Sequence, residues 1–182
     1  MRERGVPALH TLVVGTFSPM LASLRDWIAR APAGKRASRA LVETTLAPEM
    51  YGFGKQVRVA CAHAVESASR LAQIPLAPLD AHPGDDTSAL EALLDETTAR
   101  LRALPQRAFR GAETRTLVVP LEAGMTMTMT GERFARDWAL PLFYFHVVLA
   151  YGMARHAGVP LGTRDYLQHI GDAIDVVPAA PA

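Results

Sequence analysis

The chain has 182 residues, of which 49% are apolar and 20% are charged. This length and composition predict a globular protein with one core, and they exclude an intrinsically disordered chain. The formal net charge is +1 and no stretch gathers Lys and Arg on one face, so we expect no nucleic-acid partner. Cys61 is the single cysteine, so the fold does not depend on an internal disulfide.

The N-terminal segment is basic and then apolar, as in a secretory signal peptide. His10 and Pro19 interrupt its apolar part, and the apolar period continues through Trp27, which favours a helix of the mature protein. No apolar run reaches the ~18 uninterrupted residues of a membrane span. We therefore expect a cytoplasmic protein without membrane contact.

Four segments show apolar residues at every third or fourth position, which predicts four amphipathic helices. The helices are expected over about residues 9–31, 55–71, 88–104 and 131–157. At the start of the third helix, Ser88 and Glu91 have the spacing of a capping box, in which each side chain serves an unpaired N–H group.

Between the third and fourth helices the period changes to two. Residues 114–131 predict two short strands joined by a turn that holds Pro120 and Gly124. From Met125 to Thr130, Met alternates with Thr, so we expect Met inward and Thr outward on a half-buried hairpin. Such methionines can form a binding surface, but we favour the interpretation that they fill gaps in the core.

These elements predict an all-α fold, a four-helix bundle with a short β-hairpin inserted before the last helix. We expect a single domain over residues 1–170, followed by a tail over residues 171–182 without fixed structure. The last helix is apolar nearly all round from Trp138 to Met153. Such a helix is either central in the bundle or half covered by another subunit.

Two histidines interrupt this apolar helix. His146 and His156 are ten residues apart, which separates them by about 15 Å along the helix axis, so they cannot share an ion. Two ligands from one helix need a spacing of three or four residues. The positions four before and four after His146 are Leu142 and Ala150, so this helix offers one ligand.

His63 on the second helix is the candidate for a metal site shared with His146 across the bundle. Such a site has two protein ligands, whereas catalytic zinc sites commonly have three. His10 is a third candidate without local support. The other interpretation of His146 is a hydrogen-bonded interior histidine. His156 lies in the last helical turn, where a cation suits the helix dipole, so we expect a capping role.

Four segments carry a resemblance to a known family: "FSPML", "LAPEMYGFGKQVRVAC", "MTMTGERFARDWALPLFYFH" and "FYFHVVLAYGMARHAGVPLGTRDYL". Their order and spacing resemble the bacterial domain-of-unknown-function family numbered nineteen ninety-three, within the DinB/YfiT-like superfamily. The resemblance spans about residues 10–167. It implies a DinB-like four-helix bundle that is often dimeric.

The superfamily resemblance also implies a possible metal site. Better-known members hold a divalent metal on one histidine of the second helix and a four-apart pair on the fourth, and some are thiol-dependent transferases. Here His63 and His146 match two of these positions, and the third histidine is missing. We therefore expect no bound metal, with zinc or nickel on His63 and His146 as the alternative.

Gln56 and His146 are polar residues in apolar helices, and a buried polar group is costly unless it is paired. Either they pair with each other, which would be structural, or they line a small pocket between helices. The pocket candidates are Tyr51, Gln56, His63, Trp138, Tyr144 and His146.

The sequence leads to a first functional hypothesis, a DinB-like homodimer that binds a small molecule and lacks a complete three-histidine site. The alternative is a metal-dependent enzyme, of thiol-transferase or hydrolase type, that uses His63 and His146. A third hypothesis is a stress-response interaction protein without a ligand. The sequence leaves open whether the protein is an enzyme.

Overall fold

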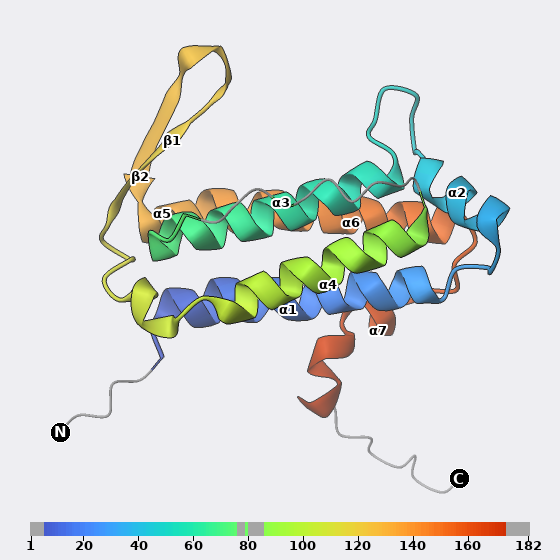
Figure 1. Ribbon diagram of the computed structural model, residues 1–182, viewed down its shortest axis with the longest axis horizontal. Coiled ribbons are helices and arrows are strands. Elements are labelled where there is room, and N and C mark those ends of the chain that lie inside the picture. Colours follow the sequence, from blue (N-terminus) through green and yellow to red (C-terminus); the bar gives the residue numbers. More distant parts are fainter. Residues whose placement is uncertain (1–5, 76–78, 80–85, 174–182) are drawn as a thin grey trace, which may run out of the picture.

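Four long helices form the body of the computed structural model, which describes residues 6–75, 79 and 86–173. They are α1 (Ala8–Ala29), α3 (Phe53–Ala72), α4 (Thr87–Ala103) and α6 (Leu140–His156). Helices α1 and α6 run in one direction, and α3 and α4 run in the other (Figure 1). Both α6 and α4 pack against α3 and α1. The predicted four-helix bundle is therefore confirmed.

Short elements connect and flank these helices. Helix α2 (Lys35–Glu43) follows α1, and the 3-10 helix η1 (Gln106–Phe109) follows α4. An antiparallel hairpin of β1 (Thr116–Pro120) and β2 (Thr126–Thr130), with η2 (Glu122–Gly124) at its turn, precedes the last long helix as predicted. The remaining elements are α5 (Gly131–Phe134), the π-helix η3 (Ala135–Ala139), α7 (Thr163–Tyr166) and η4 (Gln168–Ala173).

The apolar stripe of α3 forms the centre of the core. Its five members are completely buried: Val57, Cys61, Ala64, Ala68 and Leu71. Three of them are small, which lets neighbouring helices come close to the α3 backbone. The buried face of α1 adds bulky side chains, among them Phe17 and Trp27. Burial of each such large side chain stabilises the fold by about 1.5–3 kcal/mol.

The start of α4 corrects the predicted capping box. The helix begins at Thr87, and the Asp86 side chain accepts a hydrogen bond from the backbone N–H of Ala89. Asp86 therefore occupies the N-cap, and Ser88 lies inside the first turn. The prediction placed the start two residues late because Ser and Asp are both good N-cap residues, and the sequence offers both.

The last helical segment is continuous from Gly131 to His156 but is not α-helical throughout. The Thr130 side chain caps its start by accepting from the Arg133 N–H, as expected. The π-helix at residues 135–139 ends two residues before Pro141, which has no N–H to donate and crowds the carbonyl four residues earlier. The proline is thus accompanied by a short π-helical segment in the preceding turn. Gly158, with φ +88°, follows the end of the helix.

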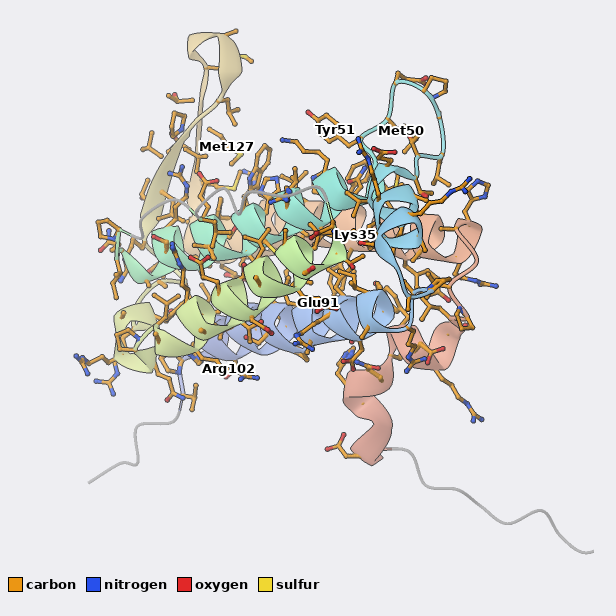
Figure 2. All side chains as sticks on the ribbon, turned by 45° about the vertical axis from the view of Figure 1, so that its right-hand side comes forward. Lys35, Met50, Tyr51, Glu91, Arg102 and Met127 are labelled. Atoms are coloured by element: carbon orange, nitrogen blue, oxygen red, sulfur yellow. The ribbon has the colours of Figure 1, made fainter. Side chains whose placement is uncertain are left out.

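The hairpin stands at one end of the bundle and projects beyond it (Figure 1). Leu117 and Val119 of β1 are buried, and Met127 and Met129 of β2 are half-buried against the core. Met127 points from the hairpin toward the helices (Figure 2). The alternation is therefore confirmed for these two methionines and wrong for Met125, which is exposed because it precedes the paired strand.

The C-terminal segment folds back onto α1. The Trp27 indole N–H donates to the carbonyl of Asp165, and the Asp165 carboxylate pairs with Arg30. Helix η4 includes residues 171–173 of the predicted tail, and residues 174–182 lie outside the described residues. The predicted domain boundary at residue 170 stays a prediction. Within the described ranges, no helix is both long and apolar enough to cross a membrane.

Candidate functional site

His63 and His146 meet where α3 packs against α6. Their imidazole rings stack with centroids 5.5 Å apart and an angle of 18° between the ring planes. His146 is buried, with 7% of its surface exposed, whereas His63 is half-buried. The Phe145 ring contacts His146 edge-on, with centroids 5.1 Å apart. The two histidines that the sequence singled out therefore lie side by side.

A chain of hydrogen bonds fixes the orientation of His146. The Gln56 side-chain amide donates to the backbone carbonyl of Tyr51, at 3.2 Å. This leaves the Gln56 Oε1 atom facing Nδ1 of His146, at 2.6 Å. Because an amide oxygen only accepts, His146 carries its proton on Nδ1, and its Nε2 atom has a free lone pair. The pairing of Gln56 with His146, one of the two predicted alternatives, is thus observed.

Both imidazoles are neutral at physiological pH. Burial, and secondarily the neighbouring His63, lower the pKa of His146 to about 4. Burial also lowers the pKa of His63, against the opposing effect of the Glu66 carboxylate. A general base works best when its pKa lies near the operating pH. His146 is therefore suited to accept a hydrogen bond or to ligate, and is poorly suited to general-base catalysis.

A small pocket opens beside His63, between α3, the hairpin and the π-helix. Its volume is about 130 Å³, and His63, Trp138 and the buried Ser67 are among its lining residues. The hairpin supplies the apolar wall of residues 119–121, and Phe134 supplies another side. Glu66 and Arg70, which form an ion pair, complete the lining. The pocket is apolar on the hairpin side and polar on the α3 side.

Two predicted pocket residues lie elsewhere. The Tyr51 side chain is 56% exposed beneath the Lys55 ammonium group, and only the Tyr51 carbonyl takes part in the site. Tyr144 is half-buried against Phe143. Burial, and secondarily the nearby Tyr144, raise the pKa of Tyr166, so Tyr144 lies on the α7 side of α6. Tyr144 and His146 are two residues apart, so their side chains diverge by about 200° around the helix.

Ser67 and the hairpin wall were missed at the sequence level. Ser67 is four residues after His63, and this helical spacing places both side chains on one face of α3. That signal was present in the sequence. No comparable signal exists for Val119 to Leu121, because the hairpin reaches α3 through tertiary packing.

The three-histidine metal site that the sequence resemblance implies does not fit these residues. Ala150 is fully buried and Leu142 half-buried at the two positions where a four-apart partner of His146 would stand. Among the described residues, no group of three or more His, Cys, Asp or Glu side chains is arranged to hold a metal ion. His10 instead contacts Phe109 at the start of α1.

The other cavities have a different character. A wider one of about 770 Å³ lies between the end of α1, α2 and the start of α4. Lys35 and Glu91, both labelled in Figure 2, are among its charged lining residues. A cavity of about 370 Å³ lies on the opposite flank of His63, toward α4. The pocket beside Trp138 combines His63 with apolar walls from β1, α5 and the π-helix.

The fold is that of a DinB-like helical bundle. The chain belongs to the family described as Domain of unknown function (DUF1993), whose model matches residues 9–167. It is also similar to the crystal structure of a DinB family member protein from Shewanella denitrificans. The two chains are 28% identical, the match covers 96% of each, and the TM-score is 0.78. No curated protein matches the chain.

Proposed function

We propose that this DinB-like bundle is a cytoplasmic homodimer that binds a small molecule at the pocket beside His63. The observation that carries the proposal is the pair of neutral imidazoles, oriented through Gln56, next to a pocket with apolar walls. Ligand pockets typically combine apolar walls with a few placed polar groups. The similar bundle from Shewanella denitrificans supports a shared architecture.

The pocket indicates the class of ligand. Neutral imidazole nitrogens and the Ser67 hydroxyl accept hydrogen bonds from a hydroxyl or amide N–H group. Trp138, Phe134 and Val119 suit an apolar or aromatic body. At about 130 Å³, the pocket is smaller than the sites of drug-sized ligands, which begin near ~300 Å³. The ligand is therefore a small neutral molecule, or one end of a longer one.

Nuclear magnetic resonance tests this proposal with a panel of small alcohols, phenol and primary amides. We expect the Trp138 indole and the His63 ring signals to shift with at least one probe, and the Trp138 shift to disappear in His63→Phe. His156→Ala is the matched control, because His156 is exposed at the end of α6. If no probe shifts these signals, or if His63→Phe binds as the wild type does, the proposal fails.

The second candidate is a metal-dependent enzyme of transferase or hydrolase type. The Gln56–His146 hydrogen bond favours it, because a second hydrogen bond of this kind orients metal-ligating histidines elsewhere. Elemental mass spectrometry on protein purified without an affinity tag decides the matter. Near-stoichiometric zinc or nickel that disappears in His146→Ala would support this candidate, and equal trace metal in both proteins would reject it.

The exposed side of α6 supports the homodimer. Phe145 and Val148 are 57% and 51% exposed, although α3 and α1 cover the other faces of the same helix. Large exposed apolar patches mark interaction sites. Sedimentation at micromolar concentration is expected to show a dimer, and a monomer would reject this part of the proposal.

A further inference from the structure

The outward face of α6 carries no charged side chain between Asp137 and Arg155. Phe145 and Val148 lie at its centre, and Pro141 and Gly152 lie toward its ends. At 1.5 Å per residue, the stretch from Pro141 to Gly152 is about 16 Å long. This face is a continuous apolar surface rather than a scatter of single exposed residues.

The segment before α3 widens this surface. Leu46 and Tyr51 are 47% and 56% exposed, and a Leu46 methyl group lies 4.0 Å from the point where a Cβ atom on Gly152 would stand. Tyr51 lies outside the bundle, at the end where α2 is located (Figure 2). The apolar surface therefore continues from α6 onto a neighbouring segment.

We propose that a second copy of this chain covers the surface, with the two α6 helices antiparallel across a twofold axis between His146 and Val147. The inference rests on the proposed homodimer and adds its geometry. The axis places Phe145 of each copy opposite Val148 of the other, and Pro141 opposite Gly152. Each pair joins a larger side chain with a smaller one, which suits close packing of two helices.

The charges at the two ends of the surface favour the antiparallel arrangement. Asp137 lies about 14 Å from the proposed axis in one direction, and Arg155 lies about 13 Å from it in the other. Asp137 is already paired with Arg133 and Arg136 of its own helical segment, so its end of the surface is compensated. An antiparallel pair keeps the two Arg155 side chains at opposite ends of the interface and opposes the two helix dipoles. A parallel pair would place like ends together.

The pairing also reaches the histidine site. Phe145 contacts the His146 ring edge-on at 5.1 Å between centroids, so a second copy seated on Phe145 holds that ring against His146. We expect the His146 ring signals in a magnetic resonance spectrum to move when Val148→Asp separates the copies. His10, at the start of α1, is the internal control. Unchanged His146 signals in the separated protein would overturn this link.

Sedimentation velocity tests which surface forms the dimer. Val148→Asp and Phe145→Asp are expected to weaken dimerisation by about 30-fold or more, as changes at a central interface residue do. Val118→Asp is the matched control, because Val118 is 59% exposed on the hairpin, away from α6. The substituted positions are exposed, so we expect each variant to fold. Circular dichroism checks this expectation.

Cysteine cross-linking tests the direction of the helices without adding a charge. The native Cys61 is fully buried and does not interfere. In the antiparallel pair, the two 148 positions are offset by about 4–5 Å along the axis and the two 152 positions by about 16 Å. Val148→Cys is therefore expected to form a disulfide-linked dimer under mild oxidation, and Gly152→Cys is not.

The outcomes separate this inference from the proposed homodimer. A dimer that Val148→Asp leaves intact, with no cross-link in Val148→Cys, overturns the α6 pairing while the homodimer stands. A cross-link in Gly152→Cys as efficient as that in Val148→Cys overturns the antiparallel direction. A monomeric wild-type protein overturns both proposals, whereas ligand binding at the pocket would be tested separately by its own probes.

Discussion

His146 illustrates how one buried polar side chain is tolerated in an apolar helix. Its Nδ1–H group donates to Gln56, whose amide donates in turn to the Tyr51 carbonyl. Both buried side chains thus have hydrogen-bond partners, so the cost of removing His146 from water is largely offset. Protonation of the ring would place a charge in a buried position, so burial, and secondarily the neighbouring His63, lower the pKa of His146.

This low pKa predicts a pH-dependent stability. The pKa of His146 is about 4 in the folded protein and 6.5 for an unperturbed histidine, so the unfolded chain binds the proton more readily. The contribution of neutral His146 is complete above pH 6.5 and is lost as the pH falls toward 4. Between pH 7 and pH 4, the wild type should lose about 2–3 kcal/mol more unfolding free energy than His146→Gln.

Urea denaturation at a series of pH values measures this difference. His156→Ala serves as the control for the loss of a histidine at an exposed position. Equal pH dependence in the wild type and in His146→Gln would contradict the prediction.

At the scale of elements, the junction between the hairpin and the last helix fixes the position of the pocket wall. The Gly131 N–H donates to the Arg115 carbonyl, which joins the start of α5 to the segment before β1. A Cβ atom on Gly131 would stand 2.0 Å from the Ala112 carbonyl oxygen. The backbones approach so closely that no side chain fits between them.

Gly131→Ala is therefore expected to be destabilising. The Ala112 carbonyl belongs to the backbone and cannot rotate away, so we expect a loss of about 1–3 kcal/mol, as in overpacked cores. Gly15→Ala on α1 is the matched control: nothing lies within 4 Å of its Cβ position, and alanine should stabilise the helix by about 0.5–1 kcal/mol. Thermal unfolding followed by circular dichroism measures whether each variant is less or more stable than the wild type. A Gly131→Ala variant as stable as the wild type would contradict the close approach of the two backbones.

At the scale of the whole molecule, the C-terminal segment completes the core at one end of α1. Tyr166 stacks on Trp27 with ring centroids 5.9 Å apart, and Tyr151 contacts both rings. Gln168 donates to the carboxylate of Asp26 on α1. Trp27 is completely buried because α6 and this segment both cover it.

Removal of residues 163–182 should expose Trp27. We expect the tryptophan emission to shift to longer wavelength and quenching by acrylamide to increase, because the indole loses Tyr166 and the Asp165 carbonyl. Trp138→Phe in both proteins isolates the Trp27 signal. Identical emission from the full-length and shortened chains would show that the segment does not cover Trp27.

Much of the fold was predictable because helical periodicity is local. The spacing of Val57, Cys61 and Ala64 determined which face of α3 is buried, and the alternation around Met127 determined the hairpin. The cost of burying Gln56 and His146 indicated that they need partners. Leu142 and Ala150 at the four-apart positions already showed that the last helix supplies one histidine to the site.

Tertiary structure alone decided which of these faces meet. The sequence by itself determined the four helices, the hairpin and the polar residues that require partners, because each depends on neighbours along the chain. The stacking of His63 on His146, the hairpin wall of the pocket and the cover over Trp27 join residues from distant segments. Their contacts depend on how the helices pack side by side, and local periodicity carries no information about that arrangement.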